Sequence, residues 1–183
     1  AERSRSLDER DRLTVLVATL CHDLGKGDTP PSEWPQHLGH EAAGVPHVEA
    51  LLRRWPSLTD QRGLMLARHV AELHVQIRQF DELRAGTLAK LYDRFFRAKD
   101  YPVALFALAV AADVAGRLDC AHEGPPVAAR VRADLDWLRA TCGAVDATAL
   151  RERHGDDLER FRAALHEARA HAIAAAWSQR SNR

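Results

Sequence analysis

Apolar residues recur at intervals of three and four along most of the chain, which places them on one face of an α-helix. In the first segment this stripe consists of Leu13, Leu16, Val17, Leu20 and Leu24. Ser6 and Glu9 have the spacing of a capping box, and Gly25 can end a helix cheaply in a left-handed conformation. The sequence therefore predicts a first helix from Ser6 to just before Gly25, with the leucine face buried.

The same spacing predicts helices over residues 36–55, 59–74, 87–96 and 102–118 and, after the break at residues 123–126, three more that end near residue 177. Ser57 and Asp60 are expected to cap the third helix, and Thr87 the fourth. Gly44 and Pro46 are expected to bend or interrupt the second. Because no segment alternates with a period of two residues, the predicted fold is all-α.

The composition narrows the class of protein. A chain of 183 residues with 46% hydrophobic and 28% charged residues is typical of one soluble globular domain. Its 26 basic and 26 acidic residues cancel, so any contact with nucleic acid must be a local patch. The three cysteines lack the paired spacing of a zinc site, and their odd number argues against a disulfide framework. No apolar run has the length of a membrane span, and the first residues do not have the pattern of a signal peptide. We therefore expect a cytoplasmic protein without a membrane partner.

Asp113 is the most informative single residue. It lies in the nearly uniformly apolar stretch 104–116, where an unpaired carboxylate would be costly to bury. A metal ion or a cationic partner would compensate the charge, and Arg117 is expected to point to a different face. The alternative is a carboxylate that caps a neighbouring element or reaches the surface.

His22 and Asp23 are expected in the last turn of the first helix, beside a loop. Imidazole nitrogens and carboxylate oxygens bind divalent cations such as Mg, Mn, Ni or Zn. Adjacent helical residues can share an ion only if it lies along the edge between them, so a third ligand from another helix is needed. We predict that Asp113 supplies it.

Three further histidines and one lysine are candidates with two interpretations each. His37 and His40 are three residues apart and could together bind a second metal or a phosphate, or each could be solvated or hydrogen-bonded. His74 at the expected end of the third helix has the same ambiguity. Lys26 could pair with a substrate phosphate or be a solvated loop residue.

Basic residues outnumber acidic ones in the middle of the chain, six against three. The basic residues are Arg78, Arg84, Lys90, Arg94, Arg97 and Lys99, and the acidic ones are Asp81, Glu82 and Asp93. Such a patch could contact RNA backbone but is also within the range of ordinary surface. No phosphate-binding glycine loop or nucleophile elbow is present, so a metal-activated water is the chemistry these residues offer.

The segments that carry a family resemblance are residues 20–30, which read LCHDLGKGDTP, and residues 37–41, which read HLGHE. They resemble the HD-domain signature of bacterial CCA-adding tRNA nucleotidyltransferases. Residues 82–93 and 111–117 are similar to the same family in the same order, and residues 144–177 resemble the tail of its multifunctional CCA branch. The resemblance spans nearly the whole chain.

The resemblance implies an HD-domain helical bundle of about seven to nine helices with a short helical C-terminal extension. Residues 1–125 would form the HD domain, and residues 126–183 would form the extension packed on it. It implies 2′,3′-cyclic phosphodiesterase, 2′-nucleotidase and phosphatase activities that use Mg, Ni or Mn, with a tRNA 3′ end or a nucleotide phosphate ester as substrate. His22, Asp23 and Asp113 match the metal-binding positions. His40 and His74 match positions near the metal or phosphate.

Two departures leave alternatives open. No histidine precedes His22, where the family has one on an upstream helix, so either the chain begins after that residue or the site lacks a ligand. The N-terminal nucleotidyltransferase region is also absent, and this chain alone is not expected to add CCA. The alternatives to a phosphohydrolase are a non-catalytic tRNA-binding scaffold and a stand-alone HD nucleotide phosphohydrolase.

Overall fold

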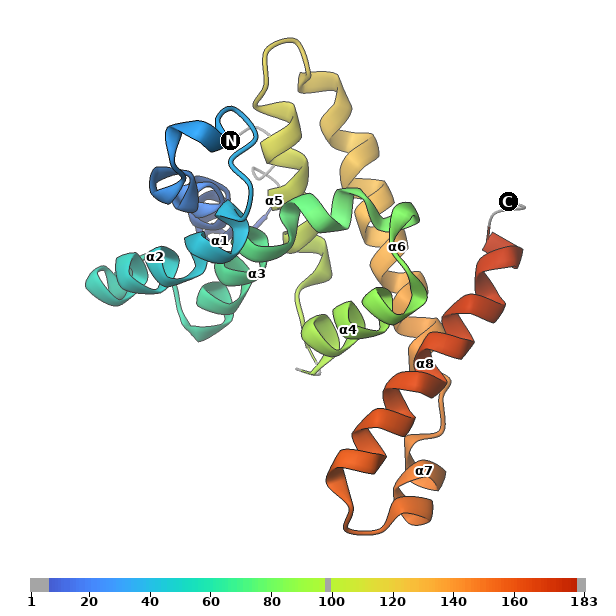
Figure 1. Ribbon diagram of the computed structural model, residues 1–183. Coiled ribbons are helices and arrows are strands. Elements are labelled where there is room, and N and C mark those ends of the chain that lie inside the picture. The colour runs from blue at the N-terminus through green and yellow to red at the C-terminus, as the bar shows by residue number, and fades with distance from the viewer. Residues whose placement is uncertain (1–6, 98–99, 181–183) are drawn as a thin grey trace. The chain divides into compact units, whose positions relative to one another are not determined.

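The computed structural model describes residues 7–97 and 100–180 of the chain. All regular elements in that part are helices, eight of them α-helices, so the predicted all-α fold is confirmed (Figure 1). None of the described helices is long and apolar enough to cross a membrane. The predicted cytoplasmic location stays a prediction.

The helices form two compact units that interleave along the chain. The first unit comprises Ala1–Arg78 and Pro102–Arg132, and the second comprises Gln79–Tyr101 and Ala133–Arg183. The functional division into residues 1–125 and 126–183 stays a prediction, since the units follow packing alone.

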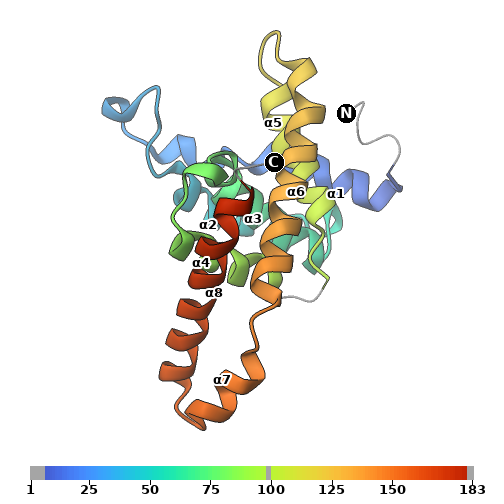
Figure 2. The same cartoon turned by 90° about the vertical axis from the view of Figure 1, so that its right-hand side faces the viewer.

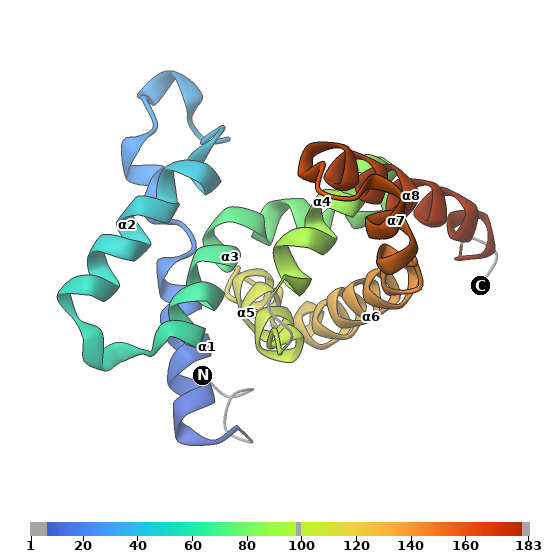
Figure 3. The same cartoon turned by 90° about the horizontal axis from the view of Figure 1, so that it is seen from below.

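The first unit is built around α3. Its principal helices are α1 (Glu9–Cys21), α2 (His40–Arg54), α3 (Gln61–Arg78) and α5 (Val103–Ala115). Helix α3 contacts the other three, as Figure 3 shows from below. Fully buried apolar side chains join the helices, and they include Ala18, Leu66, Val70, Phe106 and Val110. This packing brings three stretches distant in sequence to one place.

Helix α1 begins at Glu9 because Asp8 caps it, accepting a hydrogen bond from the Asp11 backbone N–H at 2.8 Å. The predicted cap Ser6 lies outside the described residues. Asp60 caps α3 in the same way through the Gly63 N–H at 2.8 Å. Short acidic caps thus place both helix starts within a few residues of the predicted ones.

The prediction for the buried face of α1 is confirmed for Val17 and wrong for the four leucines. Leu13, Leu16 and Leu20 are 39%, 41% and 78% exposed, and Leu24 is 38% exposed. The buried face consists instead of Thr14, Val15, Val17, Ala18 and Cys21. These side chains are smaller than leucine, so α1 can approach α3 and α5 closely. With this face buried, the C-terminal end of α1 is turned toward the interior.

Helix α2 starts later and runs more regularly than predicted. It begins at His40, after Gly39 in a left-handed conformation with φ 79°. It continues to Arg54 through Pro46, which is exposed, so the carbonyl left unpaired by the proline can be hydrated. Helix α3 extends past the predicted end at His74 to Arg78, which makes His74 an interior position of the helix.

The second unit contains α4 (Ala85–Phe96), α7 (Ala147–His154) and α8 (Leu158–Arg180). Helix α6 (Gly124–Gly143) passes from one unit into the other along the chain. Helices α7 and α8 lie side by side (Figures 1 and 2), and α8 also contacts α4. Arg84, not Thr87, occupies the position before the first residue of α4, and Thr87 lies in its first turn.

Aromatic packing holds the second unit together. The rings of Phe80, Trp137 and Trp177 contact one another with centroids 5.4–6.1 Å apart. The Arg180 guanidinium lies 4.8–5.4 Å from the same three rings and pairs with the buried Asp134 carboxylate. This cation–π and ion-pair cluster fixes the end of α8 to the rest of its unit.

Candidate metal centre

His22 and Asp23 lie where α1 gives way to a short 3₁₀ helix, Leu24–Asp28. His22 keeps helical dihedrals, whereas Asp23 has φ −105° and ψ 10°. Both adjacent side chains are turned toward the interior at this change of backbone conformation. Their side chains are only 15% and 32% exposed.

Close backbone contact between two glycines brings α2 to this junction. A Cβ atom on Gly25 would lie 2.0 Å from the His40 carbonyl oxygen and 2.5 Å from the Gly44 nitrogen. Only a residue without a side chain fits, so Gly25 acts through close approach and not as a left-handed helix end. The contact places His40, the first residue of α2, beside Asp23.

Five side chains from four elements converge on the site, all within the first unit. His22 Nε2 lies 3.1 Å from Asp23 Oδ2 and 3.3 Å from Asp113 Oδ1. Asp23 Oδ1 lies 3.3 Å from His40 Nε2 and 3.8 Å from His74 Nε2. The structure thus brings together the predicted residues of α1 and α5 with the two less certain histidines.

Two overlapping groups have the composition of a metal site. One consists of His22, His74 and Asp113, and the other consists of Asp23, His40 and His74. The ligand atoms in each group lie within 4.8 Å of one another. Two ligands on opposite sides of one ion are about 4.4 Å apart when each bond is about 2.2 Å, so small side-chain rotations would suffice. His74 belongs to both groups.

Backbone carbonyls fix the orientation of all three imidazoles. His22 Nδ1 lies 2.6 Å from the Thr19 carbonyl oxygen, His40 Nδ1 2.8 Å from that of His37, and His74 Nδ1 3.0 Å from that of Val70. Each Nδ1 therefore carries the proton and donates it. In the neutral form of each ring Nε2 carries the lone pair, and it points to the site.

Three buried polar atoms at the site have no hydrogen-bond partner. They are His22 Nε2, His40 Nε2 and Asp23 Oδ1. Burying such atoms unpaired costs free energy comparable to a lost hydrogen bond each. His22 Nε2 belongs to the first group of ligand atoms and the other two atoms belong to the second, and each group has the nitrogen and carboxylate ligands that would hold a divalent cation.

The Asp113 carboxylate has cationic partners, which is one of the two kinds of compensation that its sequence context suggested, and metal binding stays a prediction. Its Oδ1 faces His22, while its Oδ2 accepts a hydrogen bond from Arg78 Nη1 at 2.9 Å. Arg117 Nη2 is 3.7 Å from the same Oδ2, so the expectation that Arg117 points to a different face is wrong. Residues four apart share a helix face, and α5 and its continuation follow that rule.

Neighbouring charges outweigh burial at the two carboxylates. Burial opposes ionisation of Asp113, but the adjacent His22 ring and Arg117 guanidinium lower its pKa to about 2. Burial likewise opposes ionisation of Asp23, and the hydrogen bond from Lys26 Nζ at 2.6 Å lowers its pKa. Both residues are therefore negatively charged ligand candidates at neutral pH.

The pKa values of His22 and His74 are shifted in opposite directions. Burial would lower the pKa of His22, but the Asp113 carboxylate beside it raises that pKa. Burial and the nearby His22 lower the pKa of His74. The buried His74 therefore favours the neutral form, which is the form that binds metal ions.

His37 lies outside the cluster and is hydrogen-bonded, which is one of the two interpretations that its sequence left open. It precedes α2, adopts φ 52°, and its Nδ1 lies 2.5 Å from Thr29 Oγ1. His37 and His40 therefore do not share a helical face, because the chain turns at Gly39 before the helix begins. The His37 backbone carbonyl, not its ring, contacts His40.

The predicted RNA-binding residues separate into two kinds. Arg78 is part-buried and engaged with Asp113, so its first role is at the site. Arg84, Lys90, Arg94 and Arg97 are exposed on and around α4 in the second unit. Lys99 lies outside the described residues. The RNA-binding assignment of the four exposed residues stays a prediction.

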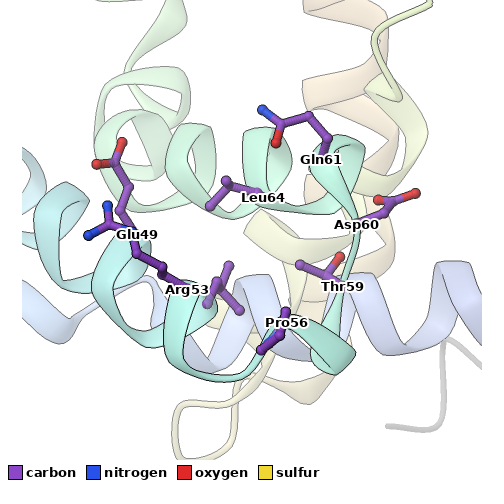
Figure 4. A pocket seen from close by; sticks show the side chains of 8 residues that line it. Glu49, Arg53, Pro56, Thr59, Asp60, Gln61 and Leu64 are labelled. Atoms are coloured by element: carbon purple, nitrogen blue, oxygen red, sulfur yellow. The ribbon is translucent and has the colours of Figure 1, made fainter.

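A groove of about 290 Å³ lies elsewhere in the first unit, between α2 and the start of α3 (Figure 4). It is lined by Glu49, Leu52, Arg53, Pro56, Thr59, Asp60, Gln61 and Leu64. Two of its charges already have partners, since Glu49 pairs with Arg68 at 2.9 Å and Asp60 pairs with Arg10. None of the clustered histidines or aspartates lines this groove.

The sequence left His74 with two interpretations and placed Arg78 only in the basic patch, whereas the structure sets both beside aspartates of the cluster. RNA binding by Arg78 stays a prediction. The signal that could have found both is the length of α3, because residues 74 and 78 are four apart and share the face that meets α5 once the helix continues past His74. The place of these two residues in the cluster could not be predicted from α3 alone, because Arg78 contacts the Asp113 carboxylate 35 residues further along the chain.

Comparisons with known proteins identify the family of the chain. The chain matches the family model described as HD domain over residues 1–101. It is 36% identical to the multifunctional CCA protein of Cupriavidus metallidurans, over 88% of this chain and 38% of that protein. It is 37% identical to that of Ralstonia nicotianae, over 90% and 37%, and 36% identical to that of a Janthinobacterium species, over 90% and 39%. The chain thus spans about two fifths of the length of these relatives, and no solved structure matches it.

Proposed function

The chain belongs to the HD-domain family, and on this premise we propose that it is a metal-dependent phosphohydrolase for 2′,3′-cyclic phosphates, 2′-phosphates and other phosphate monoesters of nucleotides or RNA ends. HD domains are generally metal-dependent hydrolases. The observation that carries the proposal is the cluster of buried, unpartnered ligand atoms on His22, His40 and Asp23.

The proposed ligand set combines the three ligands predicted from the sequence with His74, which the distances add. His22, Asp23 and Asp113 would hold the ion, and His74 would complete the set because it belongs to both groups of ligand atoms. When bound, a divalent ion lowers the pKa of a coordinated water and offsets negative charge on phosphoryl oxygens. The proposed ion is Mg, Ni or Mn, since the carboxylates suit Mg and Mn and the imidazoles suit Ni.

Positive side chains around the ligands are suited to a phosphate. Lys26 Nζ is held 2.6 Å from Asp23 Oδ2 while its side chain stays 40% exposed, so it can contact an incoming phosphate oxygen. Arg117 is 54% exposed next to Asp113 and offers a second cation. These residues would neutralise and orient the ester, and His40 would contact it from the Asp23 side.

Replacement of one ligand tests the proposal. We expect Asp23→Ala to abolish hydrolysis of adenosine 2′,3′-cyclic phosphate in added magnesium or nickel, and to lower the metal content found by elemental analysis. Asp28→Ala is the matched control, because Asp28 lies in the same segment, is 54% exposed and pairs with His47. Equal hydrolysis by wild type and Asp23→Ala would contradict the proposal.

The cellular substrate and partner are part of the same proposal. The relatives named multifunctional CCA protein suggest that the phosphate ester is at a tRNA 3′ end. They also suggest that an N-terminal nucleotidyltransferase region works with this domain in a longer protein.

A second candidate function is a tRNA-binding scaffold without hydrolysis. The exposed basic residues on and around α4 favour it, since Arg84, Lys90, Arg94 and Arg97 all face solvent. It predicts tRNA affinity that falls with salt and weakens when Arg94 and Arg97 are replaced by Gln, with no cyclic-phosphate hydrolysis. Binding that does not change with salt would count against it.

A further inference from the structure

Trp34 is a large aromatic side chain left exposed on the segment between α1 and α2. It is 59% exposed and follows a short 3₁₀ helix, Pro31–Glu33. The segment projects from the first unit (Figure 2). A single exposed aromatic is ordinary surface unless something orders it.

Hydrogen bonds converging on Thr29 order this segment and tie it to the metal centre. The Trp34 indole N–H donates to the Thr29 carbonyl at 3.3 Å, and His37 Nδ1 lies 2.5 Å from Thr29 Oγ1. Thr29 Oγ1 donates to the Lys26 carbonyl at 2.8 Å, and Lys26 Nζ contacts Asp23. One end of the segment is thereby fixed to a predicted ligand.

The other end is fixed to the same ligand through His40. The His37 carbonyl accepts from the His40 backbone N–H at 3.1 Å and from His40 Nδ1 at 2.8 Å. His40 Nε2 then faces Asp23 Oδ1 at 3.3 Å. Trp34 and His37 therefore stand on a closed loop whose two ends both meet Asp23.

The ring pair itself has the character of a stacking surface. The Trp34 and His37 ring centroids are 6.0 Å apart with an interplanar angle of 39°. The indole N–H is already used by Thr29, so what Trp34 offers to solvent is its apolar π face. Nucleobases stack on such faces with little dependence on base identity.

We propose that Trp34, supported by His37, is the platform on which the base of the bound nucleotide stacks, so that the site selects nucleotide phosphates over phosphate esters without a base. The inference rests on the proposed phosphohydrolase function, because it assigns the substrate class of that site. Lys26 and the predicted ligands would hold the phosphate end, and Trp34 the base end.

Trp55 provides a matched comparison within the same unit. It is 53% exposed, close to the value for Trp34, and it follows α2 next to a short 3₁₀ helix, Pro56–Leu58. Among the described residues its ring makes no aromatic contact and its indole N–H has no acceptor. It is an exposed tryptophan that is not connected to the metal centre.

The test measures binding of two probes that the site cannot hydrolyse, adenosine and inorganic phosphate, with magnesium present. Titration calorimetry on the full chain would compare wild type, Trp34→Ala, Trp34→Phe and Trp55→Ala. We expect Trp34→Ala to weaken adenosine binding by about five-fold to a hundred-fold, the loss typical of removing one stacking aromatic. Phosphate affinity should not change, Trp34→Phe should retain most adenosine affinity, and Trp55→Ala should match wild type.

Two outcomes would overturn the platform. One is an equal loss of adenosine and phosphate affinity in Trp34→Ala, which would mean that the residue only supports the loop. The other is unchanged adenosine affinity in that variant. The proposed function fails separately: if wild type hydrolyses no phosphate ester while Trp34→Ala still loses adenosine binding, the platform stands and the hydrolase does not.

Discussion

At the scale of single residues, the two oxygens of the Asp113 carboxylate contact different partners. Its Oδ1 faces the ligand cluster, whereas its Oδ2 is held by Arg78 at 2.9 Å. The arginine has two opposed effects on a bound cation. It orients the carboxylate, which favours binding, and it brings a positive charge nearby, which disfavours binding.

We predict that orientation dominates, and that Arg78→Ala lowers metal affinity or hydrolysis by about ten-fold to a hundred-fold, as loss of a residue that orients a ligand commonly does. Metal binding followed by calorimetry separates the two effects, because removal of the charge alone would tighten binding. Arg68→Ala is the control on the same helix, since Arg68 pairs with Glu49 away from the site. Unchanged or tighter metal binding in Arg78→Ala would show that orientation is not the main effect.

At the scale of elements, the contact between the 3₁₀ helix Leu24–Asp28 and α2 decides where His40 stands. Gly25 and Gly44 meet backbone to backbone, and a Cβ on Gly25 would overlap main-chain atoms that cannot rotate away. Gly27, two residues later, has nothing within 4 Å of the corresponding position. Gly27 therefore has room for a side chain, whereas Gly25 does not.

We expect Gly25→Ala to lower the free energy of unfolding by about 1 to 3 kcal/mol, the usual cost of overpacking, and to displace His40 from Asp23. Urea denaturation monitored by circular dichroism would measure the loss. Gly27→Ala should be neutral or slightly stabilising, because it restricts the unfolded chain without a clash. Similar stability of the two variants would show that α2 can move away from the junction at little cost.

At the scale of the whole molecule, the candidate metal centre belongs to one of two compact units. All five clustered side chains lie within the first unit, and none comes from the second. A ligand that binds only the folded state stabilises the part of the protein that contains its site. Metal binding should therefore act on the first unit.

We predict that magnesium, manganese or nickel at about 100 times its dissociation constant stabilises the site by about 2.7 kcal/mol. In a protein of this size that raises Tm by about 5 to 11 °C. Differential scanning calorimetry would measure the shift, which Asp113→Asn should remove and Asp28→Asn should retain. If two transitions are resolved, only one should move; a shift that survives in Asp113→Asn would place the ion elsewhere.

Local chemistry in the sequence was enough to predict the helical class and most element positions. It was also enough to predict that the side chains of His22, Asp23 and Asp113 lie close together. Apolar spacing and turn residues act over a few positions, so they can be read without knowledge of distant partners. A carboxylate inside an apolar helix demands compensation wherever that helix packs. These features are properties of short segments.

Only the tertiary structure decided which face of α1 is buried, and that His74 and Arg78 belong to the site while His37 lies beside it. The spacing of α1 allowed two faces, and packing against α3 and α5 selected the one with small side chains because it permits a closer approach. The roles of His74 and Arg78 depend on contacts with Asp23 and Asp113, far along the chain. Contacts at such separations arise from the fold as a whole, and no short segment encodes them by itself.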